Sequence, residues 1–300
     1  MSAPLIGSWE ATKHGEVPAL SRIVSRTEPG PVLFLGDLHL DHPKADRAGL
    51  KRVLDEAVER DAAIVLVGDV FDVMQGRNDR RSSKGALQAR YGRDDYLTAV
   101  LEDVTDFLLP YARHLWLILD GNHEATILKY NEVSLTRLLV HNLNTIGDGH
   151  VLAPGYQTWA VLKTAHHAKG DDRNRRVVTP MWLTHGSGGN ARVTKGAIGM
   201  QRRAVTYPDA SFIISGHLHT DLYVPHVQHR LSQKGRVHNV KQKHFQVSAW
   251  KNDHGNAADY ANMKGFDPTM PSGWWCEVYR ARGENPVPPH FCRFYEVDPV

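Results

Sequence analysis

Short apolar runs alternate along the first half of the chain with longer segments whose apolar residues recur at helical spacing. The runs at residues 32–35, 64–67 and 115–119 have the length and composition of strands buried on both faces. Between them, segments 50–58 and 97–108 carry apolar residues on one helical face, and Pro110 ends the second segment. This order predicts an α/β fold in which neighbouring strands are parallel and helices pack on the sheet.

The second half of the chain predicts shorter elements. We expect a helix at 135–143, strands within 151–163, a polar loop at 166–176, and short strands at 181–183 and 212–214 around a glycine-rich turn and a helix that ends near Val205. Residues 1–30 lack periodicity and are interpreted as an N-terminal extension. Residues 31–300 are interpreted as a single domain, in which 221–300 adds strands to a second sheet and loops to its rim.

Composition places the chain among ordinary folded proteins. It has 300 residues, of which 41% are hydrophobic and 23% charged, and this excludes disordered, collagen-like and coiled-coil classes. No apolar stretch approaches the roughly 18 to 20 residues that a membrane-spanning helix needs, and the first residues lack the order of a signal peptide. We therefore expect no membrane partner and a cytoplasmic location. Cys276 and Cys292 are too few for a disulfide framework and are expected to be free thiols.

Five of the apolar runs end in a side chain that can bind a metal ion. The junctions are Gly36-Asp37-Leu38-His39, Gly68-Asp69, Gly121-Asn122-His123-Glu124, His185-Gly186 and Gly216-His217-Leu218-His219. Because ligands in open α/β sheets bind at the carboxyl ends of the strands, these junctions are expected to meet in one crevice.

The candidate ligands are too many for one four-coordinate ion. They are the seven side chains of Asp37, His39, Asp69, Asn122, His185, His217 and His219. We predict two divalent ions that share a carboxylate. Imidazole, carboxylate and amide ligands without a thiolate favour Mn²⁺, with iron or zinc as alternatives.

These five junctions, in this order across residues 32–219, resemble the motifs of the calcineurin-like metallophosphoesterases. The resemblance implies a four-layer α/β-β/α sandwich of two mixed sheets flanked by helices, with a dinuclear centre at the strand ends. It implies one metal held by Asp37, His39, Asp69 and His219. It implies a second held by Asp69, Asn122, His185 and His217, so that Asp69 bridges the two. His123 corresponds to the catalytic histidine of the family and is not a ligand.

The chemistry of such a centre agrees with these assignments. Two cations about 3.5 to 4 Å apart lower the pKa of a shared water, so that a bridging hydroxide attacks phosphorus. We predict that His123 protonates the leaving oxygen as general acid and that Asp37 orients its ring. His123 and Asp37 are thus the predicted catalytic residues.

The sequence indicates the type of reaction more clearly than it indicates the substrate. Asp69 is followed by Val70-Phe71-Asp72 and lacks the Asp-Arg-Gly of the family's protein phosphatases, which disfavours a phosphoprotein substrate. A basic segment at 74–95 is either a solvated face or a clamp for substrate phosphates, and two further basic stretches lie at 166–176 and 192–203. We expect a phosphodiesterase or nuclease acting on nucleotides or nucleic acid. The alternatives are a small-molecule phosphomonoesterase and, third, a non-catalytic nucleic-acid-binding protein; the oligomeric state is left open.

Overall fold

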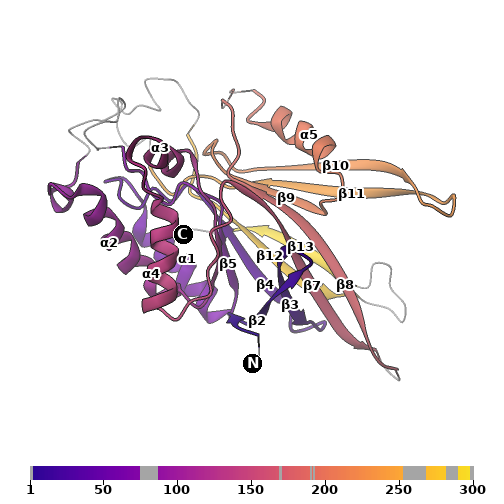
Figure 1. The fold of residues 1–300 in the computed structure, drawn as a ribbon. Helices are drawn as coiled ribbons and strands as arrows, with labels where there is room; N and C mark the ends of the chain where they lie inside the picture. The colour runs from indigo at the N-terminus through magenta and orange to yellow at the C-terminus, as the bar shows by residue number, and fades with distance from the viewer. Residues whose placement is uncertain are drawn as a thin grey trace.

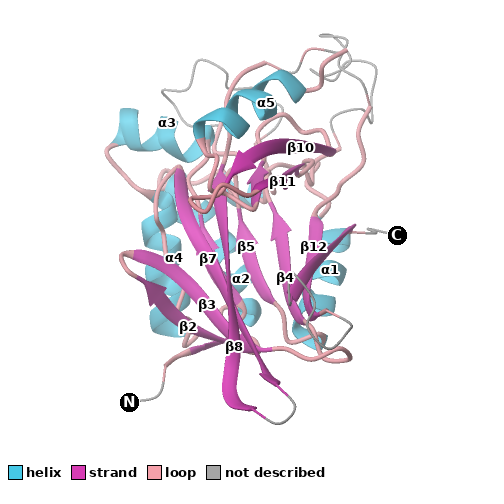
Figure 2. Ribbon diagram, turned by 90° about the vertical axis from the view of Figure 1, so that its right-hand side faces the viewer, coloured by secondary structure: helices cyan, strands magenta, loops and turns pink. Residues whose placement is uncertain are grey.

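Two β-sheets pack face to face in the computed structural model, which describes residues 3–74, 87–168, 171–189, 191, 193–252, 268–281 and 290–297 (Figures 1 and 2). The smaller sheet has the strand order β13 (His290–Glu296), β12 (Trp274–Arg280), β4 (Gly30–Leu35), β5 (Ala63–Leu66) and β6 (Leu115–Ile118). Strands β4, β5 and β6 are parallel, as the alternating pattern predicts, whereas β12 and β13 add antiparallel neighbours.

The larger sheet has eight strands. Its order is β1 (Leu5–Ile6), β2 (Trp9–His14), β3 (Val17–Ile23), β7 (Gln157–Ala168), β8 (Asp171–Thr184), β9 (Phe212–Ser215), β11 (Val237–Gln246) and β10 (Leu222–Leu231). The pairs β3–β7, β8–β9 and β9–β11 are parallel and the rest are antiparallel, so this sheet is also mixed.

Helices cover the outer faces of the two sheets. Figure 2 shows α1 (Arg47–Glu59), α2 (Tyr96–Leu108) and α4 (Leu135–Ile146) behind the smaller sheet, and α5 (Ala197–Thr206) lies over the β10–β11 end of the larger one. The remaining helical pieces are α3 (Asn122–Asn131) and the 3₁₀ turns η2 (Ala89–Tyr91) and η3 (Leu109–Tyr111). The predicted α/β sandwich of two mixed sheets flanked by helices is confirmed. None of the helices in these described ranges is long and apolar enough to span a membrane.

Strand β4 shows why its run of residues is apolar throughout. Leu33 and Leu35 pack into the layer between the smaller sheet and the helices, whereas Val32 and Phe34 pack into the layer between the two sheets. Phe34 meets Phe212 of β9 edge to face, with ring centroids 6.1 Å apart. Each side of the strand is therefore buried, which removes the polar alternation seen in half-exposed strands.

Two segments differ from the sequence-based expectation. Within the first 30 residues, 5–6, 9–14 and 17–23 form strands of the larger sheet, and Trp9 is fully buried with its Nε1 donating to the carbonyl of Pro31 over 2.9 Å. The polar loop expected at 166–176 is instead the end of the β7–β8 hairpin, paired from Gln157↔Thr184 to Ala168↔Asp171. Backbone pairing extends this hairpin through a polar sequence, so hydrophobic periodicity does not reveal it. Residues 221–300 supply strands to both sheets.

A pair of buried histidines joins the two sheets away from the strand ends described below. His166 Nδ1 of β7 lies 2.7 Å from His290 Nε2 of β13, and His290 Nδ1 lies 2.6 Å from the hydroxyl of Thr164. Two ring nitrogens at this distance share one proton, so the two facing nitrogens cannot both be protonated without an N–H to N–H clash. Burial and the neighbouring charges of His166 and Arg280 lower the pKa of His290 to about 4.

This pair predicts an acid-dependent loss of stability. A histidine whose pKa is lower in the folded than in the unfolded state contributes stability above its unfolded pKa of about 6.5, and that stability is lost as the pH falls towards the folded value. We expect urea denaturation to show about 2 kcal/mol less stability at pH 4.5 than at pH 7 from this group. In His290→Gln this part of the pH dependence should disappear, whereas exposed His14→Gln should retain it; equal slopes in both variants would contradict the prediction.

Candidate functional site

The predicted ligands come together at the carboxyl ends of five strands. Asp37 and His39 follow β4, Asp69 follows β5, Asn122 begins α3 after β6, His185 follows β8, and His217 and His219 follow β9. Among the described residues, ligand atoms of Asp37, His39, Asp69 and His219 lie within 4.8 Å of one another, and so do those of Asp69, His185 and His217. Asp69 belongs to both groups, which we call the first and second clusters.

The backbone at these strand ends adopts an uncommon conformation. Five predicted ligands have positive φ angles: Asp37 52°, His39 45°, Asp69 48°, His217 76° and His219 53°. This left-handed region is unfavourable for residues with a side chain and recurs at functional sites, where surrounding contacts hold the strain. Here the amide of Asp37 donates to Gly68 O over 2.9 Å, and the amide of His39 donates to Asp69 O over 3.1 Å.

Two glycines are required because the carboxylates pass directly over them. A Cβ on Gly121 would lie 2.0 Å from Asp69 Oδ1, and a Cβ on Gly216 would lie 2.3 Å from Asp37 Oδ2. Any side chain at either position would push a carboxylate out of its cluster. The glycines that precede Asn122 and His217 in the sequence motifs therefore make room for ligands contributed by other strands.

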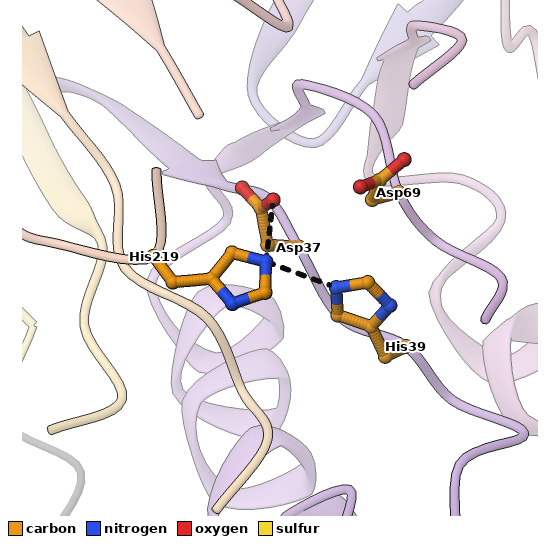
Figure 3. Close-up of side chains that lie close together, drawn as sticks. All are labelled: Asp37, His39, Asp69 and His219. Atoms are coloured by element: carbon orange, nitrogen blue, oxygen red, sulfur yellow. Dashed lines mark hydrogen bonds and ion pairs between the residues drawn. The ribbon is translucent and has the colours of Figure 1, made fainter. Parts of the chain in front are cut away.

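The first cluster is drawn in Figure 3. His219 Nε2 lies 3.4 Å from Asp37 Oδ1 and 3.3 Å from His39 Nε2. His39 Nδ1 lies 3.2 Å from the carboxylate of Asp72, which places the ring proton on Nδ1 and the lone pair on Nε2. Burial and the charge of Lys251 lower the pKa of His39 to about 4, so this ring is neutral at pH 7 and its Nε2 is available as a ligand.

The second cluster surrounds the other side of Asp69. His185 Nε2 lies 3.3 Å from Asp69 Oδ2 and 3.1 Å from Asn122 Oδ1, and His217 Nδ1 lies 2.7 Å from the same amide oxygen. The remaining ring nitrogens are occupied by backbone carbonyls: His185 Nδ1 donates to Val67 O over 2.9 Å and His217 Nε2 donates to Gly188 O over 3.1 Å. These bonds fix which nitrogen of each ring faces the cluster.

The donor set fits a bound cation. Because His185 Nδ1 must donate to a carbonyl, the neutral ring turns the lone pair of Nε2 towards the negative charge of Asp69. Burial lowers the pKa of His185, but the charges of Asp69 and Asp37 outweigh it and raise that pKa to about 9. Burial raises the pKa of Asp69, yet the charges of His123 and His185 outweigh it and hold the carboxyl well below its usual range. A proton or a metal ion between His185 Nε2 and the Asp69 carboxylate removes the repulsion between the lone pair and the negative charge. These residues can hold either.

His123 lies between the two clusters and a buried loop. Its backbone amide donates to Asp69 Oδ1 over 3.0 Å, and its Nε2 lies 3.8 Å from Asp69 Oδ2. Its Nδ1 lies 2.5 Å from the carbonyl of Asp72, which can only accept, so Nδ1 is the donor and Nε2 points towards the clusters.

The sequence predicted Asp37 as the group that orients this ring, and the structure corrects that. The Asp37 carboxylate accepts from the backbone amide of His217, at 3.1 and 2.9 Å, and pairs with His219, whereas the carbonyl of Asp72 holds His123. The partners of Asp37 lie in the loop that follows β9, and His217 is 180 residues away in the sequence. The sequence motifs did not indicate this pairing.

Buried acids that the sequence did not single out support the predicted ligands. The carboxylate of Glu124 accepts from the amides of Asp69, Phe71 and Gly121, over 3.2, 2.9 and 2.8 Å. Burial and the charge of Asp69 raise the pKa of Glu124 to about 8. Asp41 holds the next loop by accepting from the amides of Asp72 and Val73 over 2.6 and 2.8 Å.

Asp72 and Lys251 lie at the site, although the sequence did not point to either residue. Asp72 uses its carboxylate for His39 and its carbonyl for His123, so one residue orients both rings. Lys251 Nζ lies 3.7 Å from the same carboxylate. The position of Asp72, three residues after Asp69 in a segment free of other acids, is the one sequence signal that could have pointed to it.

The structure describes only part of the basic segment at 74–95. Residues 75–86, which include Arg77, Arg80, Arg81 and Lys84 of the 74–95 segment, lie outside the described residues. The side chains of Arg90 and Arg93 form ion pairs with Asp103, Asp95 and Glu102, so these two arginines match the solvated-face alternative.

Comparison with known proteins agrees with the geometry of the two clusters. The model of the calcineurin-like phosphoesterases matches residues 30–221, which is more than half of the chain. The chain belongs to this family. It is therefore a metallophosphoesterase by family, and its histidine and aspartate clusters could hold the divalent ions that phosphate-ester hydrolases of this kind use. No curated protein matches the sequence significantly.

Solved structures similar to this metallophosphoesterase include a predicted phosphoesterase from Streptococcus pneumoniae TIGR4, with 13% identity, a TM-score of 0.31, and coverage of 83% of this chain and 82% of that one. Vps29 from Entamoeba histolytica, complexed with zinc, has 12% identity, a TM-score of 0.34, and coverage of 90% and 99%. Vps29 from Chaetomium thermophilum has 8% identity, a TM-score of 0.36, and coverage of 90% and 97%.

Proposed function

We propose that this protein is a dinuclear metal-dependent phosphodiesterase that hydrolyses nucleotides or nucleic acid. The observation that supports this most is the orientation of His123, whose Nδ1 donates to a carbonyl and whose Nε2 points towards the shared carboxylate of Asp69. A nucleotide or nucleic-acid diester releases a sugar alkoxide, which departs poorly unless a proton is delivered to its oxygen. A proton donor beside two metal-binding clusters suits that reaction.

The two clusters divide the proposed ligands between two ions. Asp37, His39, Asp69 and His219 would hold one ion, through Nε2 of both histidines. Asp69, Asn122, His185 and His217 would hold the other, through Nε2 of His185 and Nδ1 of His217. Two bound divalent cations supply an activated water at neutral pH and neutralise charge on the phosphoryl group. The carboxylate and amide oxygens of Asp37, Asp69 and Asn122 suit Mn²⁺ among the candidate ions.

The protein's own groups then perform the remaining tasks. His123 carries a second proton on Nε2 and releases it to the leaving oxygen, while its Nδ1–H remains bonded to the Asp72 carbonyl. The carboxylate of Asp72 keeps the proton of His39 on Nδ1. Glu124 holds the backbone of Asp69 and Gly121 in place, so that the shared carboxylate stays between the clusters.

A substrate panel tests the proposed function. Mn²⁺-loaded protein should hydrolyse bis-p-nitrophenyl phosphate and single-stranded DNA faster than p-nitrophenyl phosphate, judged by kcat/KM. A clear preference for the monoester would replace the proposal with the phosphomonoesterase alternative. No turnover of any substrate, with both ions bound, would leave the non-catalytic alternative.

Metal content provides an independent prediction. We expect two transition-metal ions per protomer after reconstitution with Mn²⁺, because seven ligands form two clusters that share Asp69. Elemental analysis after removal of excess metal measures the ratio. His185→Ala should reduce it to about one by disrupting only the second cluster. A wild-type ratio that stays at one would exclude the bridging role of Asp69.

A further inference from the structure

Positive charge is concentrated in one continuous part of the chain. Residues 185–252 contain ten arginines and lysines against two acidic residues, Asp209 and Asp221, so their formal net charge is +8. The whole chain carries +3, and the remaining residues therefore carry −5. This segment begins at His185 and includes α5, β10 and β11. An asymmetry of this size along the chain favours the binding of polyanions to this segment.

We call α5 and the β10–β11 ribbon the basic lobe. The two strands pair over ten residues each, from Leu222↔Gln246 to Leu231↔Val237, and at about 3.3 Å per residue the ribbon is about 33 Å long. Figure 1 shows it projecting away from the sandwich beneath α5. The helix covers one face, where His226 Nδ1 lies 2.9 Å from Gln201 Oε1. Residues at odd positions of β10 and β11 lie on the opposite face.

The opposite face combines exposed apolar side chains with cations. Val227 and Leu231 are 60% and 71% exposed, and their cross-strand partners are Lys241 and Val237, both also exposed. At the turn, Lys234 and Arg236 are exposed as well. Tyr223, nearer the sandwich, is 39% exposed and stacks on Phe245 with ring centroids 5.0 Å apart. Apolar area with interspersed cations suits a ligand that presents both bases and phosphates.

The base of the ribbon adjoins the metal-binding clusters. Strand β10 begins three residues after His219, and Ser248, two residues beyond β11, donates its hydroxyl to His219 O over 3.0 Å. A linear ligand lying along the ribbon would therefore lead into the first cluster. A nucleotide bound at the clusters is too short to reach the exposed cations at the turn.

We propose that the basic lobe binds the backbone and bases of single-stranded nucleic acid and delivers the strand to the clusters, so that the substrate is a polymer. Only the hydrolysis of the bound strand rests on the proposed phosphodiesterase function, because binding to the basic lobe needs no metal. A duplex is less well matched, because its bases are stacked inside and would not cover Val227 and Leu231.

Charge neutralisation at the ribbon tests this proposal. The ribbon variant is Lys234→Gln/Arg236→Gln/Lys241→Gln, and the matched control is Lys13→Gln/Lys51→Gln/Arg113→Gln, three exposed cations outside the lobe. Fluorescence anisotropy with a labelled single strand of about 15 nucleotides, in EDTA and over a salt series, measures binding. We expect the ribbon variant to bind about 10- to 100-fold more weakly at 0.1 M salt, with a log–log salt slope smaller by about 2, and the control to match wild type.

Kinetics with loaded enzyme separate the two proposals. The ribbon variant should raise KM for the 15-nucleotide strand and leave KM for a dinucleotide unchanged. Intact strand binding without hydrolysis of any substrate would overturn the proposed function and leave the role of the lobe standing. Equal strand binding by wild type and ribbon variant would overturn the role of the lobe. The same conclusion would follow if wild type bound phosphatidylserine vesicles and no oligonucleotide.

Discussion

Asp69→Asn is expected to lower kcat/KM for bis-p-nitrophenyl phosphate by about 10³-fold or more. Asp69 is the carboxylate that both clusters contain, so under the proposed function the substitution would remove a negative ligand from two ions at once. Each ion contributes several kcal/mol of charge stabilisation, and every 1.4 kcal/mol corresponds to a factor of ten in rate. The amide oxygen of asparagine can still accept from the backbone amide of His123, so the fold around α3 should persist.

The matched comparison is His39→Ala, which disturbs only the first cluster and should retain more activity at saturating Mn²⁺. Both variants require a circular dichroism spectrum and a thermal midpoint close to wild type. Equal residual rates for the two folded proteins, with equal metal content, would count against the shared position of Asp69.

His123→Ala is expected to discriminate between leaving groups. If the Nε2 of His123 protonates the leaving oxygen, the variant should lose about 10² to 10⁴ in rate for a nucleoside alkoxide. The loss should be small for nitrophenolate, which departs without a proton. Metal content should stay at the wild-type value, because both clusters form without His123.

Steady-state rates for a series of diesters of rising leaving-group pKa measure this effect, with the exposed His141→Ala as the control. A steeper dependence on leaving-group pKa in His123→Ala than in wild type is the expected result. A uniform loss across the series would instead assign His123 to phosphate binding or to support of Asp69.

The sequence pattern predicted the parallel strands and the candidate ligands at their ends from local features of the chain. A strand buried on both faces, such as β4, must be apolar at every position, and the polar residues that follow it stand out from that background. Since parallel strands end on the same edge, Asp37, Asp69 and Asn122 could be placed together without knowledge of packing.

Elements whose stability comes from distant contacts could not be predicted in this way. Strands β1–β3 bury few residues and are completed by pairing with β7, more than 130 positions along the chain. The β7–β8 hairpin continues through a polar segment because backbone hydrogen bonds, and no apolar periodicity, define it. Backbone pairing also defines the β10–β11 ribbon, where α5 covers one face and most residues of the other face are exposed.

The sequence by itself therefore determined the α/β class, the family motifs and the identity of the side chains that meet at the strand ends. These follow from burial and from short motifs, which act over a few residues. Only the tertiary structure decided that Asp72 orients both His39 and His123, that Asp37 is bound from the loop that follows β9, and that Lys251 reaches the Asp72 carboxylate. These contacts depend on the distance and angle between groups from separate strands. They form only when the two sheets have packed together.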